Sequence, residues 1–211
     1  MNVVRKFTEG SAPGVRIVNR PEDLSIIHRP DCAALVWHRP TLATFQAWID
    51  SVQPALLPHA RAILRPVDAR EAVSESCERS GLPPCPNRAK LIEDIATLAT
   101  IFAELVDAPF LRLRLEKVTT NACRKFHMDA LTARLVCTYR GTGTQYGISS
   151  DGDDPQSVFT VPTSAPILLH GTEWPGAEQS GLLHRSPPIE GTGETRLVLV
   201  LDPIEDPGEE V

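Results

Sequence analysis

The chain has 211 residues, of which 42% are hydrophobic and 23% are charged, and its formal net charge is −6. These values are typical of a folded globular protein that is long enough to bury a core. The negative balance and the lack of a basic stripe argue against a non-specific nucleic-acid binder. The longest apolar run, residues 197–201, is far shorter than the roughly 20 residues that cross a bilayer, so no membrane span is predicted.

The N-terminal sequence and the cysteines predict a cytoplasmic protein. Residues 1–10, MNVVRKFTEG, have no apolar core of the kind found in secretory signals. The cysteines form no Cys-x-x-Cys pair, and there are five of them, an odd number, at positions 32, 77, 85, 123 and 137. This usage favours reduced thiols and excludes a zinc ribbon.

In chain order, residues 1–108 predict helices and loops with many prolines. The stretch 41–52 places its apolar residues on one helical face, with Thr41 as the expected N-cap. Residues 61–86 are interrupted by prolines and a glycine, so no long element is predicted there.

The clearest helix is predicted for residues 87–107, where Asn87 can act as the N-cap. Its apolar residues recur at alternating steps of four and three, which forms a stripe on one face. They are Leu91, Ile95, Leu98, Phe102 and Leu105. A stripe of this kind has to pack on a partner, and we expect that partner to be the outer face of a sheet formed by the residues that follow.

From residue 109 onward the hydrophobic period changes from that of a helix to that of a strand. In residues 109–118 leucines alternate with charged residues, which predicts a half-buried strand. No helical pattern separates the short strands predicted after it, so the residues favour an antiparallel sandwich or barrel. These strands are 133–140, 158–162, 165–170, 180–185 and 195–202. We therefore predict a helical and loop extension at 1–108, a β core at 109–203 and an acidic tail at 204–211.

A candidate metal site can be assembled from the β core. His127 and Asp129 lie two residues apart, so in a strand both side chains point to the same face. His184 ends a later predicted strand, and Arg196 opens the last one. Two imidazoles and one carboxylate leave further positions of a metal open, the arrangement that suits non-heme Fe(II). The guanidinium fork of an arginine beyond the second histidine could bind the far carboxylate of an oxo-acid.

Other interpretations of these residues stay open. His170 ends an apolar strand much as His184 does, so it is the rival for the third ligand. Cys123 lies four residues before His127, a spacing that can bracket a metal, although it also fits a buried inert thiol. A histidine and an aspartate on one strand can also make local hydrogen bonds without any metal.

This order of parts over residues 110–203 resembles the 2-oxoglutarate- and Fe(II)-dependent dioxygenases, whose core is a double-stranded β-helix of the cupin or jelly-roll type. The resemblance implies that His127, Asp129 and His184 bind the iron and that Arg196 binds 2-oxoglutarate. It names no substrate.

The strand after the His-x-Asp motif also resembles its counterpart in prolyl-hydroxylase-like members. There a threonine or tyrosine helps to bind the co-substrate, which implies that role for Thr138 or Tyr139. The two residues are adjacent in one strand and so lie on opposite faces. At most one of them can point inward.

The whole chain also resembles a bacterial family of unknown function whose members often lie near zinc-homeostasis genes. The pattern consists of Cys123, Phe126, His127, Asp129, residues 134–135, 138–139, 141–144 and 184–188, and Arg196-Leu197. This resemblance implies a metal-chaperone GTPase as partner. It also implies an alternative function, non-catalytic binding of Zn(II) at the same site for sensing, storage or transfer. A cysteine sulfur on the metal favours zinc, and two histidines with one carboxylate and open positions favour iron.

Overall fold

The structure is a computed structural model that describes residues 6–7, 10–150, 152–175 and 180–208. Within these residues the α-helices are α1 (Ala43–Ser51), α2 (Ala69–Arg79) and α3 (Pro86–Val106). Short 3-10 helices are η1 (Pro21–His28), η2 (Pro54–Leu56) and η3 (Pro66–Asp68). None of the helices in this part of the chain combines the length and the apolar character needed to cross a bilayer.

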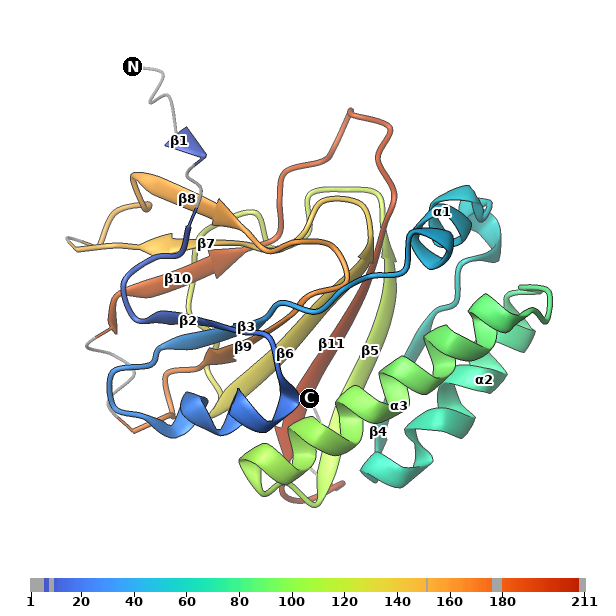
Figure 1. Ribbon diagram of the computed structural model, residues 1–211, viewed down its shortest axis with the longest axis horizontal. Coiled ribbons are helices and arrows are strands. Elements are labelled where there is room, and N and C mark those ends of the chain that lie inside the picture. The colour runs from blue at the N-terminus through green and yellow to red at the C-terminus, as the bar shows by residue number, and fades with distance from the viewer. Residues whose placement is uncertain (1–5, 8–9, 151, 176–179, 209–211) are drawn as a thin grey trace.

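The strands form two sheets that face each other (Figure 1). In the described residues the larger sheet has seven strands in the order β2-β3-β9-β6-β11-β5-β4, and the smaller has four in the order β1-β8-β7-β10. The larger sheet contains β2 (Val15–Val18), β3 (Ala34–Trp37), β4 (Ala60–Leu64), β5 (Phe110–Val118), β6 (Ala133–Arg140), β9 (Pro166–His170) and β11 (Arg196–Ile204). The smaller contains β1 (Lys6–Phe7), β7 (Gln145–Ile148), β8 (Ser157–Thr160) and β10 (Leu182–Arg185). Neighbours are antiparallel except for β2 with β3 and β1 with β8.

From β5 onward the chain passes back and forth between the two sheets. Strands β5, β6, β9 and β11 lie in the larger sheet, while β7, β8 and β10 lie in the smaller one. The loop between β5 and β6 adds to the smaller sheet through a single antiparallel bridge between His127 and His184. This alternation defines a double-stranded β-helix, so the predicted fold class is confirmed.

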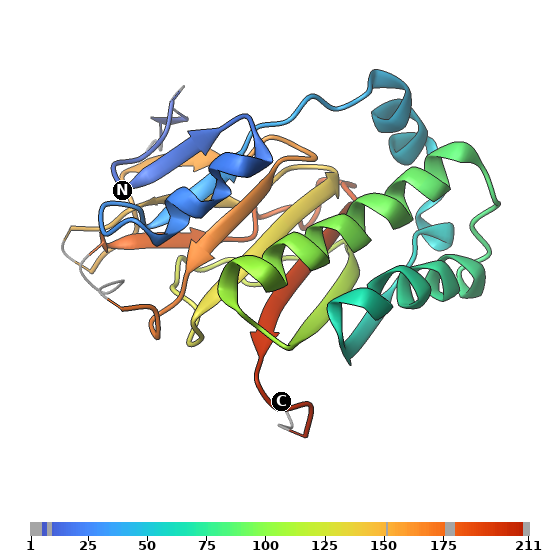
Figure 2. The same cartoon turned by 60° about the horizontal axis from the view of Figure 1, so that its bottom comes forward.

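The outer face of the larger sheet is covered by α3, as predicted (Figure 2). On β5 the leucines point to α3 and the charged residues between them point to the other face, because side chains alternate along a strand. Leu113 on β5, Leu199 on β11 and Leu98 on α3 are all buried in this layer. The amphipathic helix and the alternating strands thus bury each other's apolar sides.

A second apolar layer fills the space between the two sheets. Val136 and Val198 of the larger sheet pack against Tyr146 and Phe159 of the smaller one. The rings of Tyr146 and Phe159 stack with their centroids 5.5 Å apart. Charged residues on the inner face of β5 and β11, among them Arg114 and Arg196, are not part of this apolar layer and line a cavity between the sheets instead.

The N-terminal half is part of the core, which corrects the prediction of an extension at 1–108. Strand β3 pairs with β9, and β4 pairs with β5, so strands from both halves of the chain form one sheet. These N-terminal strands have only four or five residues. Such short segments contain too few alternations for a period of two to be visible in the sequence.

The helix boundaries also differ from the prediction in places. Helix α2 lies within 61–86, where no long element was expected, because the prolines of that segment lie outside residues 69–79. Helix α3 is capped by Cys85, whose Sγ accepts a hydrogen bond from the Arg88 N–H at 3.3 Å, and not by Asn87. A proline follows the cap at the first helical position, where its missing N–H has no cost. Thr41 does not cap α1, which begins after Leu42.

We expect Leu98→Ala to destabilise the fold by about 2–5 kcal/mol, since it leaves a cavity between α3 and the larger sheet without lowering helix propensity. Urea unfolding followed by circular dichroism measures this change. The matched control is Glu104→Ala on the exposed face of the same helix, which should change stability by less than about 0.5 kcal/mol. Equal losses in the two variants would show that α3 does not depend on this packing.

Candidate metal centre

His127 and Asp129 lie in the loop between β5 and β6, and this loop is held to both sheets. The backbone N–H and carbonyl of His127 pair with those of His184 on β10, both at 3.0 Å. Two residues later the Asp129 carbonyl accepts a hydrogen bond from the Thr172 N–H, in the turn after β9, at 2.8 Å. These backbone hydrogen bonds therefore fix the positions of the His127 and Asp129 main chains, from which the two side chains extend.

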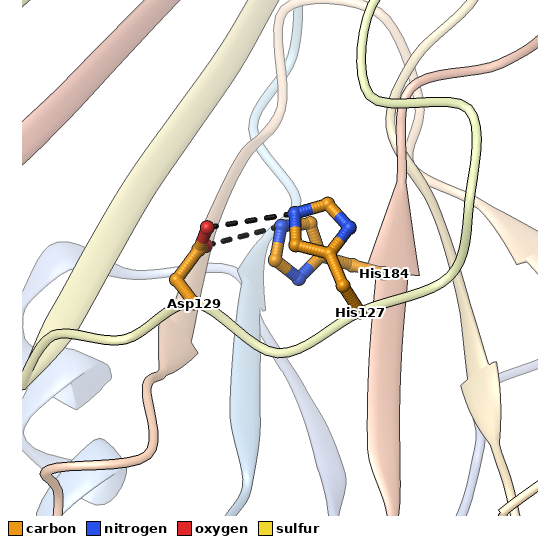
Figure 3. Close-up of side chains that lie close together, drawn as sticks. All are labelled: His127, Asp129 and His184. Atoms are coloured by element: carbon orange, nitrogen blue, oxygen red, sulfur yellow. Dashed lines mark ion pairs between the residues drawn. The ribbon is translucent and has the colours of Figure 1, made fainter.

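The side chains of His127, Asp129 and His184 converge on one point (Figure 3). One potential ligand atom from each residue lies within 4.8 Å of the others. His184 Nε2 is 3.2 Å from Asp129 Oδ2, and His127 Nε2 is 3.5 Å from Asp129 Oδ1. The two imidazole centroids are 4.6 Å apart. The structure thus brings together the three residues that the sequence suggested as ligands.

The protonation of the three groups follows from their contacts. His127 Nδ1 lies 2.9 Å from the Lys125 carbonyl, which can only accept, so Nδ1 carries the proton and Nε2 faces Asp129. Contact with Asp129 raises the pKa of His127, whereas burial lowers the pKa of His184. Burial alone would raise the pKa of Asp129, but its contacts with the two imidazoles outweigh burial and hold that pKa well below its usual range. The carboxylate is therefore ionised.

Within the described residues, one oxygen of the Asp129 carboxylate is buried without the hydrogen bond that a buried acceptor needs. Asp129 Oδ2 is buried and has no hydrogen-bond partner in the part of the chain that the structure describes, even though His184 Nε2 is near. Leaving a buried acceptor unsatisfied costs about 1–3 kcal/mol, and more when it is charged. A cation bound where the three side chains meet would satisfy it. Two imidazole nitrogens and one carboxylate oxygen are a donor set that divalent iron or zinc accepts, so these residues fit such a metal.

A buried arginine lies in the same region. The Arg196 residue is only 1% exposed, and its Nε donates to the Thr142 carbonyl at 2.6 Å. Nη2 and Nη1 donate to the hydroxyls of Thr138 and Ser186 at 3.2 and 3.4 Å. Among the described residues no carboxylate forms an ion pair with it. Burial lowers the pKa of Arg196 to about 10, although the charge of Glu194 acts in the opposite direction. The guanidinium remains charged at neutral pH.

Arg196 and the two imidazoles line one cavity. This cavity has a volume of about 110 Å³, and its walls include His127, His184, Ser186 and Arg196. It lies between the sheets, at the charged inner face of β5 and β11. Two of the three candidate metal ligands and a buried cation with hydroxyl neighbours therefore line the same cavity.

Of the two residues expected to assist Arg196, only Thr138 lies near it. Tyr139 points to the opposite face of β6, where its hydroxyl donates to Asp94 Oδ2 on α3 at 2.6 Å. The expected role in co-substrate binding thus narrows to Thr138, for the reason foreseen in the strand alternation.

The two alternative metal ligands, His170 and Cys123, do not join the cluster of His127, Asp129 and His184. His170 Nε2 is 3.0 Å from the Ile27 carbonyl, and its ring stacks on Trp174 with centroids 4.0 Å apart. Burial lowers the pKa of His170 to about 4, so this ring is neutral and serves packing. Cys123 is exposed and borders the cavity, but its sulfur is not part of the metal group formed by the described residues.

Sequence reasoning missed a pair of charged residues beside the centre. Arg134 at the start of β6 contacts Asp129 and also Asp202, which is 1% exposed on β11. Arg134 appeared in the sequence only as part of a family pattern, and Asp202 only as the end of a strand. A charged residue inside an otherwise apolar strand was the available signal for Asp202.

Solved structures share this fold over nearly the whole chain. Dioxygenase for auxin oxidation 1 from Arabidopsis thaliana, in a binary complex with 2-oxoglutarate, is 9% identical with a TM-score of 0.55, and the match covers 95% of each chain. Dioxygenase for auxin oxidation in rice is 11% identical with a TM-score of 0.51, and the match covers 92% of this chain and 83% of that one. At such identities the likeness shows the fold alone, the double-stranded β-helix found in oxygenases of this kind.

The chain belongs to the family described as "Protein of unknown function (DUF1826)", whose model matches residues 18–202. The match runs from the end of β2 into β11, so it includes the whole candidate metal centre. No curated protein is significantly similar to this sequence. The expected resemblance to a family of unknown function is confirmed, and the link to zinc-homeostasis genes stays a prediction.

We expect His184→Ala to weaken divalent metal binding by at least about 100-fold, beyond the roughly 10- to 100-fold typical for loss of an outer partner of a metal ligand. Isothermal titration with Mn(II) or Fe(II) under anaerobic conditions measures it. In the control, His170→Ala, affinity should stay at the wild-type value while stability falls by about 1–3 kcal/mol, since a buried hydrogen bond and a ring stack are lost. If His170→Ala loses metal affinity and His184→Ala does not, His170 is the metal ligand and His184 is the structural histidine.

Proposed function

We propose that this protein is an Fe(II)- and 2-oxoglutarate-dependent oxygenase. The proposal rests mainly on Arg196, a buried cation that has no carboxylate partner among the described residues. Arg196 lines the same cavity as His127 and His184, two of the three candidate metal ligands. Burying a charge is unfavourable unless an opposite charge compensates it. A dicarboxylate bound to the metal at one end would provide that charge at its other end. A protein of the same fold solved in complex with 2-oxoglutarate supports this choice.

The three converging side chains would hold the iron. His127 and His184 offer imidazole nitrogens and Asp129 offers one carboxylate oxygen, which leaves coordination positions for other molecules. When bound, iron and 2-oxoglutarate would activate dioxygen, the oxidant of the reaction, which protein side chains alone cannot do. The chain contributes orientation and exclusion of water. The Lys125 carbonyl fixes the ring of His127, and the burial of His184 keeps solvent from that side of the centre.

The guanidinium of Arg196 is oriented so that it could bind a carboxylate. Its Nε bond to the Thr142 carbonyl fixes the plane of the group, while Nη1 and Nη2 make only the longer contacts to two hydroxyls. A carboxylate accepts from such a fork more strongly than a neutral hydroxyl does. The Thr138 hydroxyl can turn its own hydrogen toward the same carboxylate, because a hydroxyl both donates and accepts. Arg196 and Thr138 would therefore bind the far end of the co-substrate together.

The zinc-binding alternative has less support. Structural zinc sites usually have four protein ligands, and Cys123 does not join the three residues that converge. A buried cation in the same cavity has no role in storing a metal. A metal-chaperone GTPase as partner and a cytoplasmic location both stay predictions.

The test is anaerobic reconstitution with Fe(II) followed by titration with 2-oxoglutarate. Chelation of the iron by the co-substrate should give a weak visible charge-transfer band, and the titration gives its dissociation constant. We expect Arg196→Ala to weaken 2-oxoglutarate binding by about 10- to 100-fold, the loss of one to two charge-assisted hydrogen bonds, while metal affinity stays unchanged. Arg196→Lys should retain part of the affinity, because it keeps the charge and loses the fork.

The matched control for this titration is Arg140→Ala. Arg140 lies on β6, the strand beside the one that carries Arg196, and donates to the Val52 carbonyl at 2.6 Å, away from the cavity, so its loss should not affect 2-oxoglutarate binding. Thermal melting of each variant separates a lost contact from a lost fold. A wild-type protein that binds Zn(II) tightly, gives no band with Fe(II) and consumes no 2-oxoglutarate would contradict the oxygenase and favour the metal-binding alternative.

A further inference from the structure

The side chain of Arg134 joins two carboxylates at the edge of the metal centre. Its Nη1 donates to Asp129 Oδ1. Its Nε and Nη2 donate to the two oxygens of Asp202, at 2.6 and 3.0 Å. One guanidinium therefore connects the carboxylate that would bind the metal to a second carboxylate on β11.

Asp202 is a rigid anchor for this guanidinium. It is 1% exposed, and Arg114 on β5 donates to its Oδ2 at 2.9 Å. Strand β11 pairs with both β5 and β6, so the three strands that carry Asp202, Arg114 and Arg134 are held in register. A two-pronged bond between arginine and carboxylate also fixes the plane of the guanidinium. The position of Arg134 Nη1 is thus set by the larger sheet.

This arrangement makes the two oxygens of Asp129 different. Oδ1 accepts a hydrogen bond from Arg134 and lies 3.5 Å from His127 Nε2, whereas Oδ2 is buried, has no hydrogen-bond partner among the described residues and lies 3.2 Å from His184 Nε2. Arg134 uses one lone pair of Oδ1 and fixes the plane of the carboxylate, so Oδ2 is the oxygen that this geometry favours as a metal ligand. A carboxylate free to turn could place both oxygens on the metal and would fill one more coordination position.

We infer that Arg134 is a positioning residue of the metal centre. Anchored on Asp202, it holds Asp129 Oδ1 and thereby presents Oδ2 as the single oxygen ligand. The inference rests on the metal site of the proposed function and is independent of the co-substrate. It adds two residues, neither of which touches the metal, to the set that determines how the metal is held.

A purely structural role for Arg134 makes a different prediction. In that case Arg134 would only neutralise the buried charge of Asp202, and any cation of similar length would replace it. Lysine separates the two roles, since its ammonium keeps the charge but is a point donor without a fork. A lysine at position 134 can neutralise the charge of Asp202, but it cannot bind Asp202 and Asp129 at the same time in the fixed geometry of a guanidinium.

The experiment is a Co(II) titration of the full chain without 2-oxoglutarate, in the wild type, in Arg134→Lys and in Arg114→Lys. Arg114 is the matched control because its guanidinium also donates to Asp202 and makes no hydrogen bond to Asp129. The titration gives the affinity, and the d–d absorption bands of Co(II) report coordination number and geometry. We expect Arg134→Lys to weaken binding by about 10- to 100-fold and to shift the bands toward a higher coordination number. Arg114→Lys should weaken binding less than Arg134→Lys does and should leave the bands at the wild-type positions, because Arg114 makes no hydrogen bond to Asp129.

Asp202→Asn gives a second, independent test if Arg134→Lys does not fold. It keeps Arg134 and the shape of the anchor but removes the anchor's charge, so it should weaken Co(II) binding in the same direction by a smaller factor. Wild-type affinity and bands in Arg134→Lys, or an equal loss in Arg114→Lys, would overturn the inference. A wild type that binds Co(II) but does not respond to 2-oxoglutarate overturns only the oxygenase, whereas a wild type that binds no divalent metal overturns both.

Discussion

The two faces of the larger sheet are buried against different surroundings. On the outer face the leucines of β5 and β11 pack under α3, while the inner face of the same strands carries Arg114, Asp202 and Arg196. Charges in such a place are stable only when they are paired, and Asp202 is paired with several arginines. Among the described residues Arg196 donates to three neutral oxygens and to no carboxylate, and Asp129 Oδ2 has no hydrogen-bond partner. At the candidate site a ligand carboxylate could pair with Arg196, and a metal could bind the free oxygen of Asp129.

Much of the candidate site could be predicted from the sequence because its signals are local. His127 and Asp129 are two residues apart, and Arg196 opens a strand that is marked by the continuous apolar run 197–201. Arg134 and Asp202 could not be paired in this way, since they are 68 residues apart in the chain. Only the register of β6 against β11 places them side by side, and a single sequence does not contain that register.

The fold was predictable where an element is long or buried on one side only, as β5 and α3 are. Strand β3 is four residues long, its first three residues are buried, and it shows no alternation that would reveal it. Choosing between His170 and His184 had the same limit. Both follow short apolar runs, and the difference lies in which sheet each strand joins, the larger one for β9 and the smaller one for β10.

The bridge between His127 and His184 belongs to the smaller sheet, while Asp129 is tied through Arg134 to the larger one. An ion bonded to all three residues would cross-link the two sheets. Its binding free energy would then add to the free energy of folding, by about 2.7 kcal/mol when the free metal is at 100 times its dissociation constant. Metal supply would in this way govern the lifetime of the protein as well as its chemistry. In a metal-starved cell the chain would unfold more often and be degraded sooner.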